Sequence, residues 1–171
     1  EEVNNLKNNR KIDEVFLTQD IGYAKLEDSK NEYKPYAFIK AFTKTSLENL
    51  SVKLTEGRLP ENADEIVIPT HLKTNGRVTL NVGDTITLNI GKRVSDGYEL
   101  DQNNSFNEEV PEEIIDTTSK TYKIVGIIER PATNIENYSA PGYTFITYMN
   151  EGNIAGKADV YFKYTKEGSK D

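Results

Sequence analysis

The closest approach to a metal-binding motif lies between residues 101 and 112. Oxygen-bearing side chains fall at Asp101, Asn103, Ser105, Asn107, Glu109 and Glu112, which is the spacing of a calcium-binding loop. The sixth position is Phe106 instead of the glycine that makes the sharp turn, and no amphipathic helices flank the segment. Because the segment is rich in Asn and Glu, this spacing arises easily by chance. We therefore favour a solvated loop and expect neither a metal ion nor a cofactor.

Acid–base chemistry has two other candidates, the single histidine and two acidic pairs. A hydrolytic triad would need His71 beside a nucleophile, and no serine lies in a Gly-x-Ser-x-Gly elbow. Its position after a Pro-Thr dipeptide suits a helix start or a surface turn. The pairs Asp64–Glu65 and Glu108–Glu109 lie in polar surroundings, where nothing predicts a carboxyl pKa raised by burial. An enzyme is therefore not expected.

The composition excludes several classes of protein. The 171 residues carry 28 acidic and 21 basic side chains, a net charge of −7, which disfavours binding to nucleic acid. The absence of cysteine excludes disulfides and thiolate metal sites within the chain. No apolar run approaches the roughly 20 residues of a membrane-spanning helix, and no signal peptide is visible. The chain begins within an apparent helix and stops just after a strand-like run, so we expect it to be a piece of a longer protein.

Hydrophobic patterning predicts a chain of short strands with few helices. The expected strands cover residues 12–18, 22–27, 36–42, 65–69, 85–90, 121–129, 142–148 and 158–164. A weak amphipathic helix is expected at 1–10, a short helix from Thr45 that ends at Gly57, and one helical turn at 71–75. Residues 91–120 form a long polar excursion, which we interpret as an exposed insertion. These patterns predict a non-catalytic binding or mechanical domain, either of the α+β class or mostly β.

Three stretches, in order, carry a resemblance to a known family. They are LTEGRLPENADEIVIP from residue 54, VGDTITLNIGKR from residue 82 and YKIVGIIERP from residue 122. Together they resemble the MacB-like periplasmic core domain of FtsX-like ABC-transporter permeases. The matching positions are Gly57, Arg58, Pro60, Glu65, Ile66, Val67, Ile68, Gly83, Asp84, Tyr122, Lys123, Val125, Gly126 and Ile127, and the resemblance covers most of residues 12–164.

The resemblance implies an α+β fold with two lobes. A porter-like βαβ lobe would comprise residues 1–56 and 155–171, and a mostly β, sabre-like lobe would be inserted at 57–154. Gly57 and Pro60 would mark the crossing between the lobes, and Arg58 is well placed to bond carbonyls or a carboxylate there. With Glu65, these residues form the expected structural site at the lobe junction.

Two features depart from the family pattern. The 91–120 excursion exceeds the compact hairpin of the family and is a candidate for partner specificity. The family also continues beyond the last strand into a further helix and strand, so the porter-like lobe is either incomplete in this chain or built differently.

The resemblance also implies a function outside the membrane without covalent chemistry. Such domains couple ATP hydrolysis to export, to resistance against antimicrobial peptides or to signalling. The implied partners are the transmembrane part of the permease and a cytoplasmic ATPase subunit, in a transporter expected to be dimeric at the cell membrane. A stand-alone surface ligand-binding or adhesion module is the alternative, and a secreted hydrolase with paired carboxylates ranks last.

A further peptide or protein partner outside the cell would need an exposed contact surface. We expect this surface to include the 94–119 part of the excursion and the loop at 134–143, NIENYSAPGY, because both are rich in turn residues. The candidate contact residues are Tyr98, Phe106, Tyr138 and Tyr143. A plain solvated loop is the alternative for both segments.

Overall fold

The structure is a computed structural model that describes residues 12–50, 52–150 and 158–164. It consists mainly of strands, with the short helices α2 (Lys44–Asn49) and α3 (His71–Thr74). The strands are β1 (Ile12–Lys25), β2 (Tyr36–Phe42), β3 (Leu54–Gly57), β4 (Glu65–Pro69), β5 (Thr85–Ser95), β6 (Tyr98–Leu100), β7 (Glu113–Ile128), β8 (Gly142–Tyr148) and β9 (Ala158–Tyr164). The helix predicted at 1–10 lies outside the described residues. None of the described helices has the length and apolar character of a membrane span.

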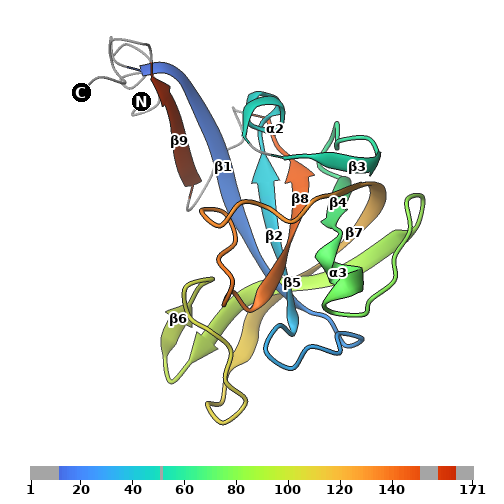
Figure 1. Ribbon diagram of the computed structural model, residues 1–171. Coiled ribbons are helices and arrows are strands. Elements are labelled where there is room, and N and C mark those ends of the chain that lie inside the picture. Colours follow the sequence, from blue (N-terminus) through green and yellow to red (C-terminus); the bar gives the residue numbers. More distant parts are fainter. Residues whose placement is uncertain (1–11, 51, 151–157, 165–171) are drawn as a thin grey trace.

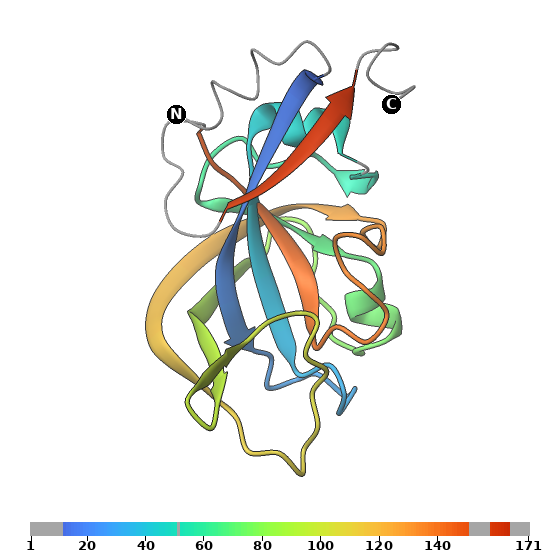
Figure 2. The same ribbon diagram turned by 90° about the vertical axis from the view of Figure 1, so that its left-hand side faces the viewer.

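The strands form one sheet that closes on itself. Its order is β3-β7-β4-β8-β2-β1-β5-β6, and β5 also pairs with β7, so that β7, β4, β8, β2, β1 and β5 form a ring. Figure 2 shows the strongly curved β7 (gold) at the side of this ring. The largest apolar cluster takes alternate side chains from all six strands, such as Ala24, Ile39, Ile66, Leu88, Ile124 and Phe145, which places it inside the ring. Leu72 of α3 also packs into this cluster.

The first strand is longer than predicted. The turn expected between 12–18 and 22–27 is a β-bulge within β1, because the pairing with β2 shifts between Asp20 and Gly22. Gly22 has a φ of 151°, and a Cβ atom there would lie 2.6 Å from the carbonyl oxygen of Gly91. The bulge therefore lets β1 continue while β5 crosses it closely.

The helix expected to end at Gly57 ends earlier. Thr43 caps α2, since its hydroxyl accepts a hydrogen bond from the backbone N–H of Ser46, and the chain becomes extended at Leu50. Gly57 belongs to β3, where it pairs with Gly126 of β7. The prediction that Gly57 stops a helix was wrong. The leucine spacing suggested one long helix, but Leu47 lies in α2 and Leu54 already begins β3.

The polar excursion is largely folded. β5 continues to Ser95 and pairs with β7 from Thr85↔Lys123 to Val94↔Glu113, so only the tip is a loop. Figure 1 shows this ribbon running down to β6. Residues 91–95 and 113–120 are therefore strands of the sheet and not an inserted loop, although most of 113–120 is exposed as expected. Pairing between the strands satisfies the backbone N–H and C=O groups of these residues, so the ribbon forms without an alternating apolar pattern.

The first and last described strands pair with each other. β9 runs antiparallel to β1 from Ile12↔Tyr164 to Gln19↔Ala158, and both project from the rest of the sheet (Figure 1). Strands from both predicted lobes join in the one sheet, for example β2 and β8 in a parallel pair. The division of the chain into two lobes stays a prediction.

The close antiparallel pairing of β3 with β7 leaves no room for a side chain at Gly57. Its φ is 74°, and a Cβ atom would lie 2.2 Å from the carbonyl oxygen of Val125. We expect Gly57→Ala to lower the free energy of unfolding by about 1–2 kcal/mol through the left-handed backbone, and by about 1–3 kcal/mol more through overpacking. Urea unfolding measures the total.

Gly97→Ala is the matched control for the backbone effect. Gly97 has a φ of 80°, and a Cβ atom there would meet nothing within 4 Å. This variant should lose only the backbone contribution. Equal losses in the two variants would contradict the steric explanation.

Candidate functional site

Arg58 and Glu65, two residues of the expected lobe junction, form an ion pair. The two terminal nitrogens of Arg58 donate to the two carboxylate oxygens of Glu65 at 2.8 and 2.5 Å, and Arg58 also donates to the carbonyl oxygen of Leu59. The hydrogen bond from Arg58 lowers the pKa of Glu65 to about 2. The expected carboxylate contact of Arg58 is confirmed, whereas its role at a lobe junction stays a prediction.

The three stretches that carry the family resemblance meet in space. The backbone N–H of Arg58 donates to the carbonyl oxygen of Val125 at 2.9 Å. Further along the same edge of β7, the N–H of Gly83 donates to the carbonyl oxygen of Ile124, and the N–H of Ile124 donates to the carbonyl oxygen of Asp84, both at 2.8 Å. The stretches are thus one hydrogen-bonded unit around β7.

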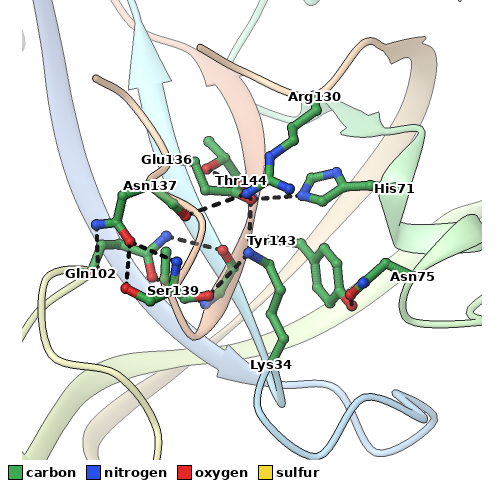
Figure 3. A network of polar contacts seen from close by, with 12 residues as sticks. Lys34, His71, Asn75, Gln102, Arg130, Glu136, Asn137, Ser139, Tyr143 and Thr144 are labelled. Carbon is green, nitrogen blue, oxygen red and sulfur yellow. Dashed lines mark hydrogen bonds and ion pairs between the residues drawn. The ribbon is translucent and has the colours of Figure 1, made fainter. Parts of the chain in front are cut away.

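A buried carboxylate, Glu136, organises a polar network that joins several segments of the chain (Figure 3). One of its oxygens accepts hydrogen bonds from the Lys34 ammonium at 2.8 Å and from Nε2 of His71 at 2.6 Å. The other accepts from the backbone N–H and the hydroxyl of Thr144 at 2.8 and 2.7 Å. Glu136 is completely buried, so this single side chain ties its own loop to β8, to α3 and to the 26–35 segment.

The electrostatics of this network keep Glu136 ionised. Burial alone would raise its pKa, but the hydrogen bond and charge of His71, with those of Lys34, lower it to about 2. Burial lowers the pKa of Lys34 in turn. Two hydrogen bonds already occupy each carboxylate oxygen, so the group has no free position for acid–base chemistry. Glu136 is therefore a structural anchor.

Sequence reasoning missed this network. His71 was expected at a helix start or surface turn; it begins α3 but is buried, with its ring edge against Tyr143. Tyr143 was expected at an exposed contact surface, and that expectation was wrong, because its side chain is fully buried and its hydroxyl donates to Asn75. Most of the loop sequence is polar, and nothing local to Glu136 signals that this carboxylate turns inward beside Ile135.

The segment with calcium-like spacing, residues 101–112, is ordered around an arginine side chain. The guanidinium of Arg93, which is fully buried, donates to both carboxylate oxygens of Glu112 and to the carbonyl oxygens of Asp101, Asn104 and Ser105. Glu112, the last position of the calcium-like pattern, also accepts from the Tyr36 hydroxyl. Among the described residues no group of three or more His, Asp or Glu side chains converges as a metal site. The loop is thus ordered by an arginine of its own hairpin.

The other predicted contact residues lie in different environments. Tyr98 and Tyr138 are 72% and 78% exposed, and the Arg130 guanidinium stacks 4.7 Å from the Tyr138 ring centroid. Phe106 is half-buried and meets Tyr36 edge to face. Exposure leaves Tyr98 and Tyr138 available for a partner; their contact role stays a prediction.

A groove of about 850 Å³ lies beside these loops. β1 and β2 form its floor, the β5–β6 hairpin forms one wall, and residues 133–137 form the other. The Asn137 amide donates to the carbonyl oxygen of Gln102 at 3.1 Å, which joins the two walls at the rim. Because Asn137 follows Glu136, the buried network also positions this wall.

Comparison with known proteins gives two structural neighbours. No family model matches the chain, and no curated protein matches it in sequence. The periplasmic region of MacB from Actinobacillus actinomycetemcomitans is 12% identical, with a TM-score of 0.48 over 97% of this chain and 64% of that one. A domain of a protein provisionally assigned as a permease, from Porphyromonas gingivalis, is 15% identical, with a TM-score of 0.49 over 91% of this chain and 57% of that one.

The chain spans less than two thirds of the length of either neighbour. Likeness at this level says nothing about activity, so any functional conclusion depends on the residues of the chain itself.

Removing the charge of Glu136 tests its role as an anchor. In Glu136→Gln, an amide N–H would face the donors Lys34 and His71, leaving a buried cation without its counter-ion. We expect the free energy of unfolding to fall by about 3–5 kcal/mol, as for other broken buried ion pairs. The exposed Glu56→Gln serves as a control and should change it by less than about 0.5 kcal/mol. Similar effects in both variants would show that the network is not anchoring the fold.

The lowered pKa of Glu136 also predicts an acid-sensitive fold. The carboxyl has an ordinary pKa of 4.5 and a folded-state pKa of about 2. Its stabilisation is therefore complete above about pH 4.5 and is lost as the pH falls towards 2. Urea unfolding between pH 7 and 2.5 should show a steeper loss for the wild type than for Glu136→Gln. Parallel curves would contradict this assignment.

Proposed function

We propose that the chain is the extracytoplasmic domain of an ABC-transporter permease that performs no covalent chemistry. The main support is that three stretches resembling the MacB-like family, widely spaced in the sequence, come together around β7 as one hydrogen-bonded unit. The domain would respond outside the membrane to ATP hydrolysis by a cytoplasmic subunit.

The pairing of β1 with β9 supports a domain held at both of its flanks. The antiparallel ladder brings the beginning of β1 beside the end of β9, from Ile12↔Tyr164 onwards. A chain that leaves and re-enters one membrane needs its two flanks side by side. The ladder would also carry movement of the flanks into β1, which continues to the far end of the sheet.

The two main buried charged side chains have their hydrogen-bonding positions occupied, which supports a non-catalytic role. Glu136 and Arg93 are the ionised groups with the most extensive buried contacts, and each is fully used in holding loops in place. A general acid or base needs a free position for a reacting atom. Within the described residues, these two groups therefore act to hold the surrounding loops rigid.

An extracellular peptide or protein partner would bind at the end of the molecule opposite the β1–β9 ladder. Figure 1 shows β6 and the following loop at that end. Tyr98 and Val110 are 72% and 49% exposed there, a pair of apolar surfaces on an ordered hairpin and loop. Binding at this end would be linked through β5 and β1 to the ladder. Export, peptide resistance or signalling would follow from that link in a dimeric transporter.

The groove favours one other function, that of a stand-alone surface module binding a small ligand or peptide. Its volume falls within the range of about 300–1,000 Å³ typical of ligand sites. Such a module would need no ATPase partner, which separates the two candidates experimentally.

Cysteine labelling in cells tests the permease proposal directly. The chain contains no cysteine, so Tyr98→Cys and Tyr138→Cys place single thiols at exposed positions. In the full-length protein, with any cysteines outside this chain replaced, a membrane-impermeant maleimide should label both in intact cells. Labelling should not increase after permeabilisation, and an ATPase should co-purify with the protein.

Ala37→Cys provides the burial control, because Ala37 is completely buried and should react only after denaturation. Labelling of Tyr98→Cys and Tyr138→Cys only in permeabilised cells would overturn the extracytoplasmic assignment. Labelling in intact cells without an ATPase partner would favour the stand-alone module.

A further inference from the structure

The groove has a rigid, mostly uncharged interior. Tyr23 and Phe38 lie in its floor, and each is about 95% buried, so strands of the sheet fix their positions. Leu100 and Ile135 contribute apolar surface from the two walls. These side chains offer a fixed surface for one or two apolar groups of a ligand.

Hydrogen bonds within the chain join the two walls of the groove at its rim. The Gln102 amide donates to the carbonyl oxygen of Gly142 and accepts from its N–H, both at 3.0 Å, as a neighbouring strand would. Asn137 bonds the same segment from the opposite wall. A groove with walls fixed in this way needs little rearrangement to bind, which lowers the entropic cost of binding.

The charged groups of the floor are paired inside the protein. Lys40 forms an ion pair with Asp20 at 3.1 Å, and Arg93 gives all its N–H groups to Glu112 and loop carbonyls. The floor therefore does not select a strongly charged ligand, whereas the exposed Lys92 and Glu99 line the hairpin wall. It is suited to neutral hydrogen-bonding groups next to apolar ones.

The Tyr23 hydroxyl is a buried donor with no hydrogen-bond partner among the described residues. Arg93 lies over the Tyr23 ring, but its N–H groups point to other acceptors. Burial raises the pKa of Tyr23, so the hydroxyl keeps its proton. A buried polar group without a partner is costly in a folded protein. Tyr23 lines the groove, so a ligand acceptor that displaces the atoms covering this hydroxyl would satisfy it.

The β-bulge in β1 provides an unpaired backbone at the same place. Ile21, the extra residue of the bulge, pairs with no residue of β2, β5 or β9, and its side chain is 42% exposed. Bulges leave such a residue without ladder hydrogen bonds and are frequent beside binding sites. An extended chain lying in the groove could bond this backbone as an added strand does.

We propose that the groove binds a peptide segment in an extended conformation. Its backbone would pair with β1 at Ile21, one backbone carbonyl would accept the Tyr23 hydroxyl, and an apolar side chain would pack on Phe38. The proposal does not depend on the permease function, because the site lies entirely within this chain.

Selection from a phage-displayed library of random heptapeptides, followed by binding measurements, tests this site. Selected sequences are synthesised with blocked termini and a fluorescent label, and their affinity for the 171-residue chain is measured by anisotropy. Ile21→Lys should weaken binding at least tenfold. Leu54→Lys replaces a side chain of matching exposure, 41%, on β3 outside the groove, and should change the affinity less than twofold.

Tyr23→Phe is the second, independent test. Loss of the unpartnered hydroxyl should raise the thermal unfolding temperature of the free protein while weakening peptide binding at least threefold. A structural role alone would not produce both changes. This variant keeps the proposal testable even if Ile21→Lys fails to fold.

Several outcomes would overturn the peptide proposal. They are a library that yields no binder, peptides whose affinity is unaffected by Ile21→Lys and Tyr23→Phe, and a neutral sugar such as chitohexaose binding the groove where the peptides do not. None of these outcomes bears on the permease proposal, since the measurements involve neither the membrane nor an ATPase. Conversely, failure of the labelling experiment leaves the groove to be tested in the same way.

Discussion

The ionised carboxylate of Glu136, completely enclosed by protein, is the constraint on which the loops of this molecule depend. An isolated buried charge is so unfavourable that every segment around it must supply a donor. Lys34, His71 and Thr144 do so from three different parts of the chain. The 130–141 segment is thereby held against the sheet despite its polar sequence, and the wall of the groove takes its position from the same contacts.

Arg93 is a buried cation, so the segments around it must supply hydrogen-bond acceptors, just as those around Glu136 must supply donors. The β5–β7 ribbon extends beyond the main apolar core, and only a small cluster around Tyr36 and Phe106 provides hydrophobic burial there. A buried guanidinium with five well-placed acceptors helps to order the loop, because its planar donors fix the direction of each carbonyl. The molecule thus has its largest apolar cluster inside the ring, smaller apolar clusters beside it, and two charged centres that help to order the loops.

These rigid centres suit a protein that transmits movement or presents a surface. The ring of strands has one described extension, the β1–β9 ladder, and the ordered tip of the β5–β6 hairpin lies at the opposite end (Figure 1). β1 passes from the ladder to the bulge at the groove, so a ligand in the groove would contact the strand that links the molecule to its flanks. Binding and movement would then be coupled through one element.

The sequence by itself determined the positions of most strands and the short helices, since β-branched and aromatic runs such as 36–42 and 142–148 have one stable local structure. It also indicated that Arg58 would bond carbonyl groups or a carboxylate, and the structure identifies that carboxylate as Glu65. Only the tertiary structure decided that Glu136 and Arg93 are buried, that β1 has a bulge instead of a turn, and that Gly57 lies in a strand. Each of these depends on partners far away in the chain, and the local sequence around a buried charge looks the same as that around a solvated one.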